Sequence, residues 1–186
     1  QVAGFLEHAR NRGAILYYDV NFRASHEHEK IKLMSNIMEN MEYADIVRGS
    51  SEDFAIQYNK TDAEAIYRSQ ISFYTKKFIY TSGSAPVILK ADGGFSKQYA
   101  VESASTVSTI GAGDNFNAGV IFGLLKHGIT REQIDNGLTE EQWDGIIDCA
   151  MRFSANVCKS INNYVDNEFA TAMQREMSDF IEENNK

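Results

Sequence analysis

Three short apolar runs of strand length, separated by segments with helical spacing, most constrain what this chain can fold into. The runs are AILYYDV, ADIVRGS and KFIYTSG. A continuous apolar run of this length is typical of a parallel strand covered on both faces, because a strand with one wet face would alternate polar and apolar residues. Helices are the usual connections between such strands. The pattern predicts an α/β fold with a mostly parallel sheet flanked by helices.

The remaining segments predict one hairpin and several helices. In PVILKADGGFSKQYAV, two β-rich runs surround Gly93 and Gly94, and a tight primed turn needs positive φ at both of its central residues. Thr139 and Gln142 have the spacing of a capping box at a helix start. The predicted helices lie before Gly13, over residues 31–41, within SSEDFAIQYN and DAEAIYRSQISFYTK, from Thr139 to Ile161, and from about Asp166 onward.

Length and composition describe an ordinary folded domain. The 186 residues suffice for one domain with a core, and 43% hydrophobic with 24% charged residues argues against disorder. The net charge of −8, without a cluster of Lys or Arg, argues against nucleic acid and anionic membranes as partners. No apolar run approaches the roughly 20 residues of a membrane span. We therefore expect a cytoplasmic protein in which Cys149 and Cys158 are reduced thiols.

Two groups of polar residues follow the predicted strands, where ligands bind in sheets of this kind. In YYDVNFR, successive side chains of an extended backbone alternate, so Asp19, Asn21 and Arg23 point the same way and could converge on a polar ligand. The alternative is a strand end with turn hydrogen bonds and a solvated Arg23. In VRGSSEDF, Glu52 lies at a helix entry, where it is either functional or only favourable to the helix dipole.

The stretch STIGAGDNFNAG predicts an anion site at a helix N-terminus. Gly111 and Gly113 free the backbone, so the amides of Gly111, Ala112 and Gly113 can turn toward a phosphate, with Asp114 beside them. The alternative is that Asp114 only caps the helix. The stretch is neither a Walker A loop nor a dinucleotide fingerprint, because Phe116 occupies the third glycine position.

The helix behind that loop, NAGVIFGLLK, is apolar nearly all round. Gly119 and Gly123 share one stripe, and we expect them to permit a close approach to the sheet.

These motifs, in this order, resemble the C-terminal part of the ribokinase-like (PfkB) carbohydrate kinase family. STIGAGDNFNAG resembles the family signature DTxGAGDxFxAG, DVNFR resembles its D-x-N-x-R strand end, and YTSGSAP before a hairpin resembles its T-x-G nucleotide segment. The resemblance covers essentially all 186 residues. It implies a ribokinase-like fold and ATP-dependent phosphorylation of a sugar or sugar-acid hydroxyl, with ATP and Mg²⁺ as cofactors.

The resemblance also implies roles for the candidate residues. Asp114 matches the general base, and Gly111, Ala112 and Gly113 match the anion hole for the transferred phosphoryl group. Asp19, Asn21 and Arg23 are the candidates for contact with substrate or phosphate. The residues matched to the nucleotide are Thr81, Gly83 and Asn156, and Glu52 matches the acid of the N-x-x-E motif linked to magnesium.

The chain departs from the family pattern at three positions. Gly49 stands where the N-x-x-E motif has Asn, and its lack of a side chain would remove an amide near magnesium-bound phosphate. Ser108 stands where the signature usually has Asp, which puts a monovalent-cation site in doubt, and Ile110 replaces a common Thr. Two alternatives to an active kinase therefore stay open: a nucleotide-binding relative with weakened catalysis, and a non-enzymatic α/β interaction domain.

Family members are longer than this chain, which begins with Gln1 rather than Met. The resemblance implies that the first strands of the sheet, the lid and much of the sugar pocket lie outside these residues. We expect a domain incomplete at its N-terminus, which by itself is inactive and associates with itself or needs the remaining part. The expected small-molecule partners are a sugar and ATP.

Overall fold

The fold is described from a computed structural model that covers residues 2–102 and 106–184. The sequence predicts one domain, and in the structure the chain divides into two compact units, Gln1–Val101 and Glu102–Lys186. The first contains the sheet and its helices, and the second consists of helices and the loops between them.

Five strands of the first unit form one mixed sheet in the order β1-β2-β3-β4-β5. Strands β1, β2 and β3 pair in parallel, with Tyr17 opposite Ile46 and Ile46 opposite Lys77. Strand β4 pairs antiparallel with β3 on one side and with β5 on the other. This confirms the predicted α/β layout, with antiparallel pairing contributed by the hairpin. The strands are β1 (Tyr17–Asp19), β2 (Ile46–Ser50), β3 (Lys77–Thr81), β4 (Val87–Lys90) and β5 (Ser96–Tyr99).

The predicted hairpin turn is confirmed. Gly93 and Gly94 have φ of 68° and 79°, in the left-handed region that favours glycine. The turn comprises Asp92–Gly94, between β4 and β5. Asp92 also forms an ion pair with Lys77 at the start of β3, at 2.7 Å.

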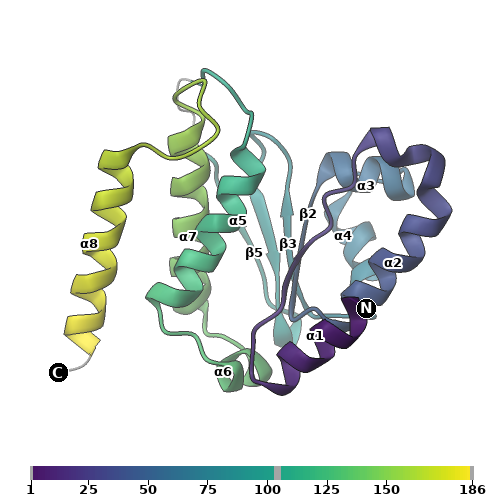
Figure 1. The fold of residues 1–186 in the computed structure, drawn as a ribbon, viewed down its shortest axis with the longest axis horizontal. Coiled ribbons are helices and arrows are strands. Elements are labelled where there is room, and N and C mark those ends of the chain that lie inside the picture. Colours follow the sequence, from purple (N-terminus) through teal and green to yellow (C-terminus); the bar gives the residue numbers. More distant parts are fainter. Residues whose placement is uncertain (1, 103–105, 185–186) are drawn as a thin grey trace. The chain divides into compact units, whose positions relative to one another are not determined.

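Three helices of the first unit, α2 (Lys30–Tyr43), α3 (Ser51–Tyr58) and α4 (Ala63–Ile66), contribute to an apolar core on one side of the sheet. Helix α1 (Val2–Asn11) precedes β1, 3₁₀ residues Ala24–Glu29 precede α2, and a π-helical turn, Tyr67–Ile71, follows α4. Helices α2, α3 and α4 lie together beside the strands (Figure 1). Phe54 of α3 and Phe78 of β3 are fully buried in this core, with ring centroids 5.7 Å apart.

One detail of α2 differs from the sequence-based expectation. The spacing predicts a buried stripe over Ile31, Met34, Met38 and Met41, but Ile31 is 92% exposed and Met38 is 38% exposed. Met34, Ile37 and Met41 form the buried face instead. Both sets of residues have helical spacing, and Met34 and Met41 belong to both. The packing of α2 in the first unit decides that Ile37, rather than Ile31 and Met38, is buried with them.

The second unit contains α5 (Ala112–Lys126), α6 (Arg131–Asn136), α7 (Glu140–Val157) and α8 (Asn167–Asn184). The capping box of Thr139 and Gln142 is confirmed at the start of α7. The predicted extent of α7 is wrong at its end, because the helix stops at Val157 and Ile161 lies in the following loop, 82% exposed. The short α6 is not predicted, although Thr130 and Gln133 form a capping box before it.

Two glycines allow α5 and α7 to touch along their backbones. A Cβ added at Gly119 would lie 2.5 Å from Cα of Ala150, and one at Gly123 would lie 2.8 Å from Cα of Ile146. The two helices run side by side in Figure 1. The expectation that this stripe approaches the sheet is therefore wrong, because its contact is with α7. Gly123 follows Gly119 in α5, whereas its contact Ile146 precedes Ala150 in α7, so the two helices are antiparallel.

An ionic cluster attaches α8 to the other two helices. Glu176 of α8 accepts from both terminal nitrogens of Arg152 in α7, at 2.8 and 2.6 Å, and from Lys126 in α5 at 3.2 Å. The hydrogen bonds from Arg152 lower the pKa of Glu176 to about 2. Met173 on the same helix is buried, so α8 is held by both apolar and charged contacts.

Cys149 and Cys158 are not joined to each other. Both are free thiols, Cys149 buried in α7 and Cys158 partly buried at the end of that helix. Burial raises the pKa of both thiols, which keeps them in the protonated form.

Within residues 2–102 and 106–184, the structure contains no helix long and apolar enough to cross a membrane.

The packing of α5 on α7 predicts that Gly119→Ala lowers the stability of the second unit. The new methyl group would overlap the backbone of Ala150, which cannot rotate away, and overpacking of this kind costs about 1–3 kcal/mol. Gly4→Ala is the matched control, because Gly4 is also helical and has nothing within 4 Å of the added Cβ. Urea unfolding should show a loss only for Gly119→Ala, and equal stability of the two variants would contradict the contact.

Candidate active site

Three polar side chains meet where β1, β2 and β3 end. Arg48 of β2 donates from Nη1 to Oδ1 of Asp19 at 3.1 Å, and from Nη2 to Oγ1 of Thr81 at 2.6 Å. The side chains of Arg48 and Asp19 are 9% and 16% exposed. Because the strands are parallel, their carboxyl ends lie at one edge of the sheet, and Arg48 there links two of the predicted site residues.

Arg48 is not among the site residues that the sequence predicts. A signal was available, since Arg48 is the one charged residue inside the apolar part of ADIVRGS, and a charge in a buried strand needs a partner. Asp19 stands directly opposite Arg48 in the pairing of β1 with β2. The register of the two strands, which sequence reasoning did not supply, identifies the pair.

The alternation expected for DVNFR is confirmed in part. Val20 and Phe22 are both buried at 5% exposure, whereas Asn21 and Arg23 between and after them are exposed. Asn21 has a φ of 32°, an uncommon value for a residue with a side chain. Asp19 pairs with Arg48, so the three polar residues of this motif do not form one closed cluster in the first unit.

The start of α3 contains two neighbouring acids in different surroundings. Glu52 is exposed, whereas Asp53 is buried. Oδ1 of Asp53 accepts from the amide of Phe22 at 2.8 Å, and Oδ2 accepts from the amide and the hydroxyl of Ser50 at 2.8 and 2.6 Å. These bonds fix the chain after β1 to the chain after β2. Asp53 therefore has a positioning role, and the link of Glu52 to magnesium stays a prediction.

Gly49 lies under an aromatic ring. A Cβ at this position would be 2.5 Å from Cζ of Phe54, so a side chain here would enter the apolar core rather than face a ligand. The next pair with the same spacing is Ser50 and Asp53, and these two residues are joined by hydrogen bonds. Gly49 is thus explained by packing against Phe54.

The two predicted nucleotide residues of the first unit lie at the end of β3. Thr81 is its last residue and accepts from Arg48. Gly83 follows in the turn before β4 with a φ of 51°, and a Cβ there would meet nothing within 4 Å. The turn is therefore open toward its surroundings at Gly83, as a backbone contact with a ligand requires.

The predicted anion loop forms the N-terminus of α5. Gly111 is the cap residue with φ 80° and ψ −1°, and it supplies no side-chain cap. Ala112, Gly113 and Asp114 are the first three helical residues, and the side chain of Asp114 is exposed. Asp114 is therefore inside the first turn rather than at the cap position. The amide of Ala112 already donates to the carbonyl of Thr109 at 3.2 Å.

Ser108 has a defined local role in the loop. Its hydroxyl accepts from the amide of Ile110 at 3.2 Å, which closes a small turn before Gly111. The amides of Val107 and Ser108 donate to the carbonyl of Cys158 at 2.8 and 3.3 Å. The segment before the anion loop is thus attached to the C-terminal end of α7.

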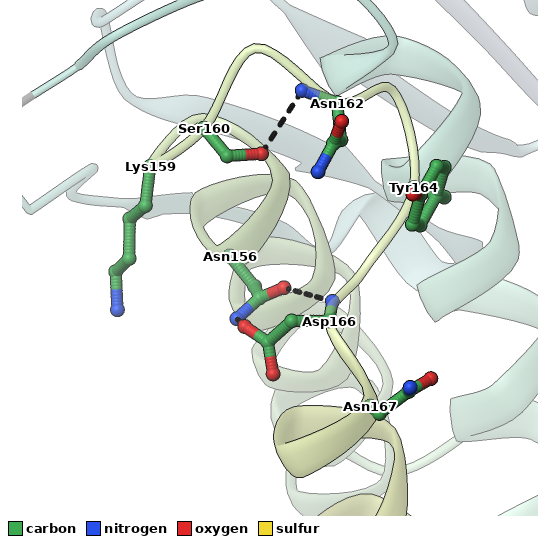
Figure 2. A pocket seen from close by; sticks show the side chains of 7 residues that line it. All are labelled: Asn156, Lys159, Ser160, Asn162, Tyr164, Asp166 and Asn167. Carbon is green, nitrogen blue, oxygen red and sulfur yellow. Dashed lines mark hydrogen bonds between the residues drawn. The ribbon is translucent and has the colours of Figure 1, made fainter.

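A pocket of about 310 Å³ lies beside this end of α7, within the second unit. Figure 2 shows the predicted nucleotide residue Asn156 in its wall, with its side chain turned toward Asp166. Oδ1 of Asn156 accepts from the amide of Asp166 at 3.1 Å, and Nδ2 donates to Oδ2 of Asp166 at 2.8 Å. The lining residues are Asn156, Lys159, Ser160, Asn162, Tyr164, Asp166 and Asn167.

The side chains that line the pocket include one aromatic ring, one carboxylate and one ammonium group, that of Lys159. The amide of Phe169 donates to Asp166 at 2.7 Å, and this bond, together with the one from Asn156, lowers the pKa of that carboxyl. Asp166 is therefore ionised at neutral pH. The amide groups, the hydroxyl group and the Tyr164 ring suit a heteroaromatic group with polar edges, and Lys159 adds a positive charge to the pocket wall.

Among the residues that the structure describes, no group of three or more His, Cys, Asp or Glu side chains is arranged to hold a metal ion. Mg²⁺ is usually bound by one or two carboxylates, water and substrate phosphates. One exposed carboxylate such as Glu52 fits a magnesium ion of that kind. It does not fit a metal ion held by protein ligands alone.

Comparison with known families gives a match over most of the chain. The profile described as "pfkB family carbohydrate kinase" matches residues 3–164. The chain belongs to the pfkB family of carbohydrate kinases. Curated relatives include the 5-dehydro-2-deoxygluconokinase of Geobacillus thermodenitrificans (strain NG80-2), 25% identical over 126 residues, which are 64% of this chain and 37% of that protein. The 5-dehydro-2-deoxygluconokinase 1 of Bacillus cereus (strain ZK / E33L) is 22% identical over 126 residues, 65% of this chain and 38% of that protein.

Solved structures of pfkB-type kinases share the fold. The aminoimidazole riboside kinase from Salmonella enterica, complexed with aminoimidazole riboside and an ATP analog, superposes with a TM-score of 0.73 at 18% identity, over 94% of this chain and 56% of that one. The fructokinase from Xylella fastidiosa with bound ATP gives 0.73 at 20% identity, over 100% and 57%. This pfkB chain therefore spans little more than half the length of these structures.

The buried pair in the sheet predicts that Arg48→Met destabilises the first unit by about 3–5 kcal/mol, because Asp19 would keep a buried charge without its partner. The double variant Asp19→Asn with Arg48→Met should recover most of the loss. Arg68→Met is the control, since the Arg68–Glu64 pair is 77% and 42% exposed and its loss should change the free energy of unfolding far less. The three variants are compared by urea unfolding, and equal losses for Arg48→Met and Arg68→Met would contradict the prediction.

Proposed function

We propose that this chain is the nucleotide-binding and catalytic-base part of an ATP-dependent kinase that phosphorylates a hydroxyl group of a sugar or sugar acid. The observation that carries the proposal is the N-terminus of α5. A glycine without a side-chain cap begins a helix in which an exposed carboxylate, Asp114, is the third residue. Membership of the pfkB family supports the reaction class.

The proposed chemistry at this helix needs two groups. A sugar hydroxyl that attacks phosphorus must lose its proton, and we assign that proton to the carboxylate of Asp114. Charge that develops on the phosphoryl oxygens needs fixed donors, and the start of a helix offers amides and a favourable dipole. Because the amide of Ala112 donates to Thr109, the anion hole rests mainly on Gly111 and Gly113.

We assign the base of the nucleotide to the pocket in Figure 2. Its amide, hydroxyl and phenol groups suit a purine and a ribose, and Asn156 belongs to its wall. The loop that lines the pocket also touches the anion loop, since Asn163 lies about 3.0 Å from the position of a Cβ on Gly111. Thr81 and Gly83 are proposed as further nucleotide contacts.

Magnesium is proposed as the accompanying cation. Glu52 would bind it directly or through water, and the ion would neutralise negative charge on the phosphates. For Asp19, Asn21 and Arg23 the proposed role is contact with substrate or phosphate. Arg23 is exposed and able to reach an anion, whereas Asp19 would act while it remains paired with Arg48.

The substrate is to be found with a panel assayed on the full-length protein. The names of the relatives suggest 5-dehydro-2-deoxygluconate, fructose and aminoimidazole riboside as its first members. A second candidate function is a nucleotide-binding relative with weakened catalysis, which the Ser108 hydroxyl in place of a signature carboxylate favours. ATP binding without turnover of any sugar would select it.

The proposal predicts that Asp114→Asn in the full-length protein lowers kcat by about 10²- to 10⁴-fold, the usual effect of a lost general base. The affinity for ATP should change little, because the backbone donors remain. Asp179→Asn on the exposed side of α8 makes the same chemical change away from the loop and should leave kcat unaltered. Steady-state kinetics and calorimetric ATP titration measure both, and a near wild-type kcat for Asp114→Asn would remove it from the mechanism.

A further inference from the structure

The side chain of Asn115 joins two loops that are distant in the sequence. Its Nδ2 donates to the carbonyl of Gly111 at 2.9 Å and to the carbonyl of Asn163 at 3.0 Å. Its own backbone amide also donates to Gly111, at 2.9 Å. Both hydrogens of one carboxamide are therefore used on backbone oxygens, one in the anion loop and one in the loop after α7.

The contact that Asn115 holds is a tight one. Gly111 has φ 80°, and an added Cβ would lie 3.0 Å from both Cβ and the carbonyl oxygen of Asn163. The loop after α7 is fixed at its start by the bonds from Val107 and Ser108 to Cys158, and at its end by the pair of Asn156 with Asp166. Asn115 supplies a third attachment, in the middle of that loop.

The same loop forms much of the pocket wall, since Ser160, Asn162 and Tyr164 line the pocket on either side of Asn163. The position of Asn163 against Gly111 therefore sets the spacing between the pocket and the N-terminus of α5. We propose that Asn115 is a positioning residue that holds these two parts in register, so that one nucleotide can occupy the pocket while its terminal phosphate reaches Asp114. This inference rests on the proposed kinase function.

A carboxamide suits this role because it donates twice without carrying a charge. Asp at position 115 would present only acceptors to two carbonyl oxygens at neutral pH, and it would regain one donor when protonated. Leu branches at the same carbon atom but has no donor. These two substitutions therefore separate the loss of the donors from the addition of a charge next to a phosphate site.

The experiment compares Asn115→Leu and Asn115→Asp with wild type in the full-length protein. Asn36→Asp, at an exposed position of α2, is the control for the chemical change. The dissociation constants for ATP and for the sugar are measured separately by calorimetry, and KM for ATP and kcat by steady-state kinetics. Thermal unfolding, followed on the same samples, establishes that each variant is folded at the assay temperature.

We expect Asn115→Leu to weaken ATP binding and raise KM for ATP by about tenfold, the effect of losing the two hydrogen bonds that join the anion loop to the loop after α7, with sugar binding unchanged. Asn115→Asp should weaken ATP binding at neutral pH at least as much as Asn115→Leu, because the ionised carboxylate presents only acceptors to the two carbonyl oxygens and adds a negative charge beside the phosphate site.

An ATP affinity of Asn115→Leu within about twofold of wild type would overturn the assignment while leaving the kinase proposal intact. Equal weakening of ATP and sugar binding would also overturn it, because it would indicate general disturbance of the fold. Absence of ATP binding by the wild-type protein would instead refute the proposed function, and the role of Asn115 with it.

Discussion

The backbone contact between α5 and α7 determines the arrangement of the second unit. Gly119 against Ala150 and Gly123 against Ile146 bring the two helix axes so close that no other residue type fits without a shift. Because the helices are antiparallel, the N-terminus of α5 lies beside the C-terminus of α7. The loop that leaves α7 consequently passes over Gly111, and its Asn163 carbonyl accepts a hydrogen bond from Asn115. The anion loop and the pocket are therefore neighbours as a consequence of helix packing.

The first unit is organised by a different interaction, a buried charge shared among three strands. Arg48 bonds to Asp19 on one side and Thr81 on the other, at the edge where ligands of parallel sheets bind. A buried ion pair contributes little net stability over an apolar substitute, but it is costly to break from one side. Arg48 thereby fixes the positions of the candidate residues Asp19 and Thr81. Asp53 fixes the chain after β1 by accepting a hydrogen bond from the amide of Phe22.

Much of the fold could be predicted from the sequence, because the signals for strands and hairpins are local. The apolar runs, the Gly93–Gly94 turn and the capping box of Thr139 were sufficient for the order of elements. The errors arose where packing decides. Ile31 and Met38 have the same helical spacing as the buried methionines, and only the position of α2 on the sheet exposes them. The glycine stripe of α5 is evident in the sequence, but spacing alone does not distinguish the sheet from α7 as its partner.

For the candidate site, the sequence by itself determined the residue types. The glycines and the acid of the anion loop, the polar strand end and Asn156 are all evident in the linear order, because the chemistry of each residue is a local property. Only the tertiary structure decided which of them have partners. It paired Asp19 with Arg48 and buried Asp53 while leaving Glu52 exposed. It also brought Asn163 against Gly111 and into a hydrogen bond with Asn115, 48 residues away in the sequence. The physical reason is that strand register and helix contact are collective properties of packing, which join residues whose separation in the sequence carries no signal of their proximity.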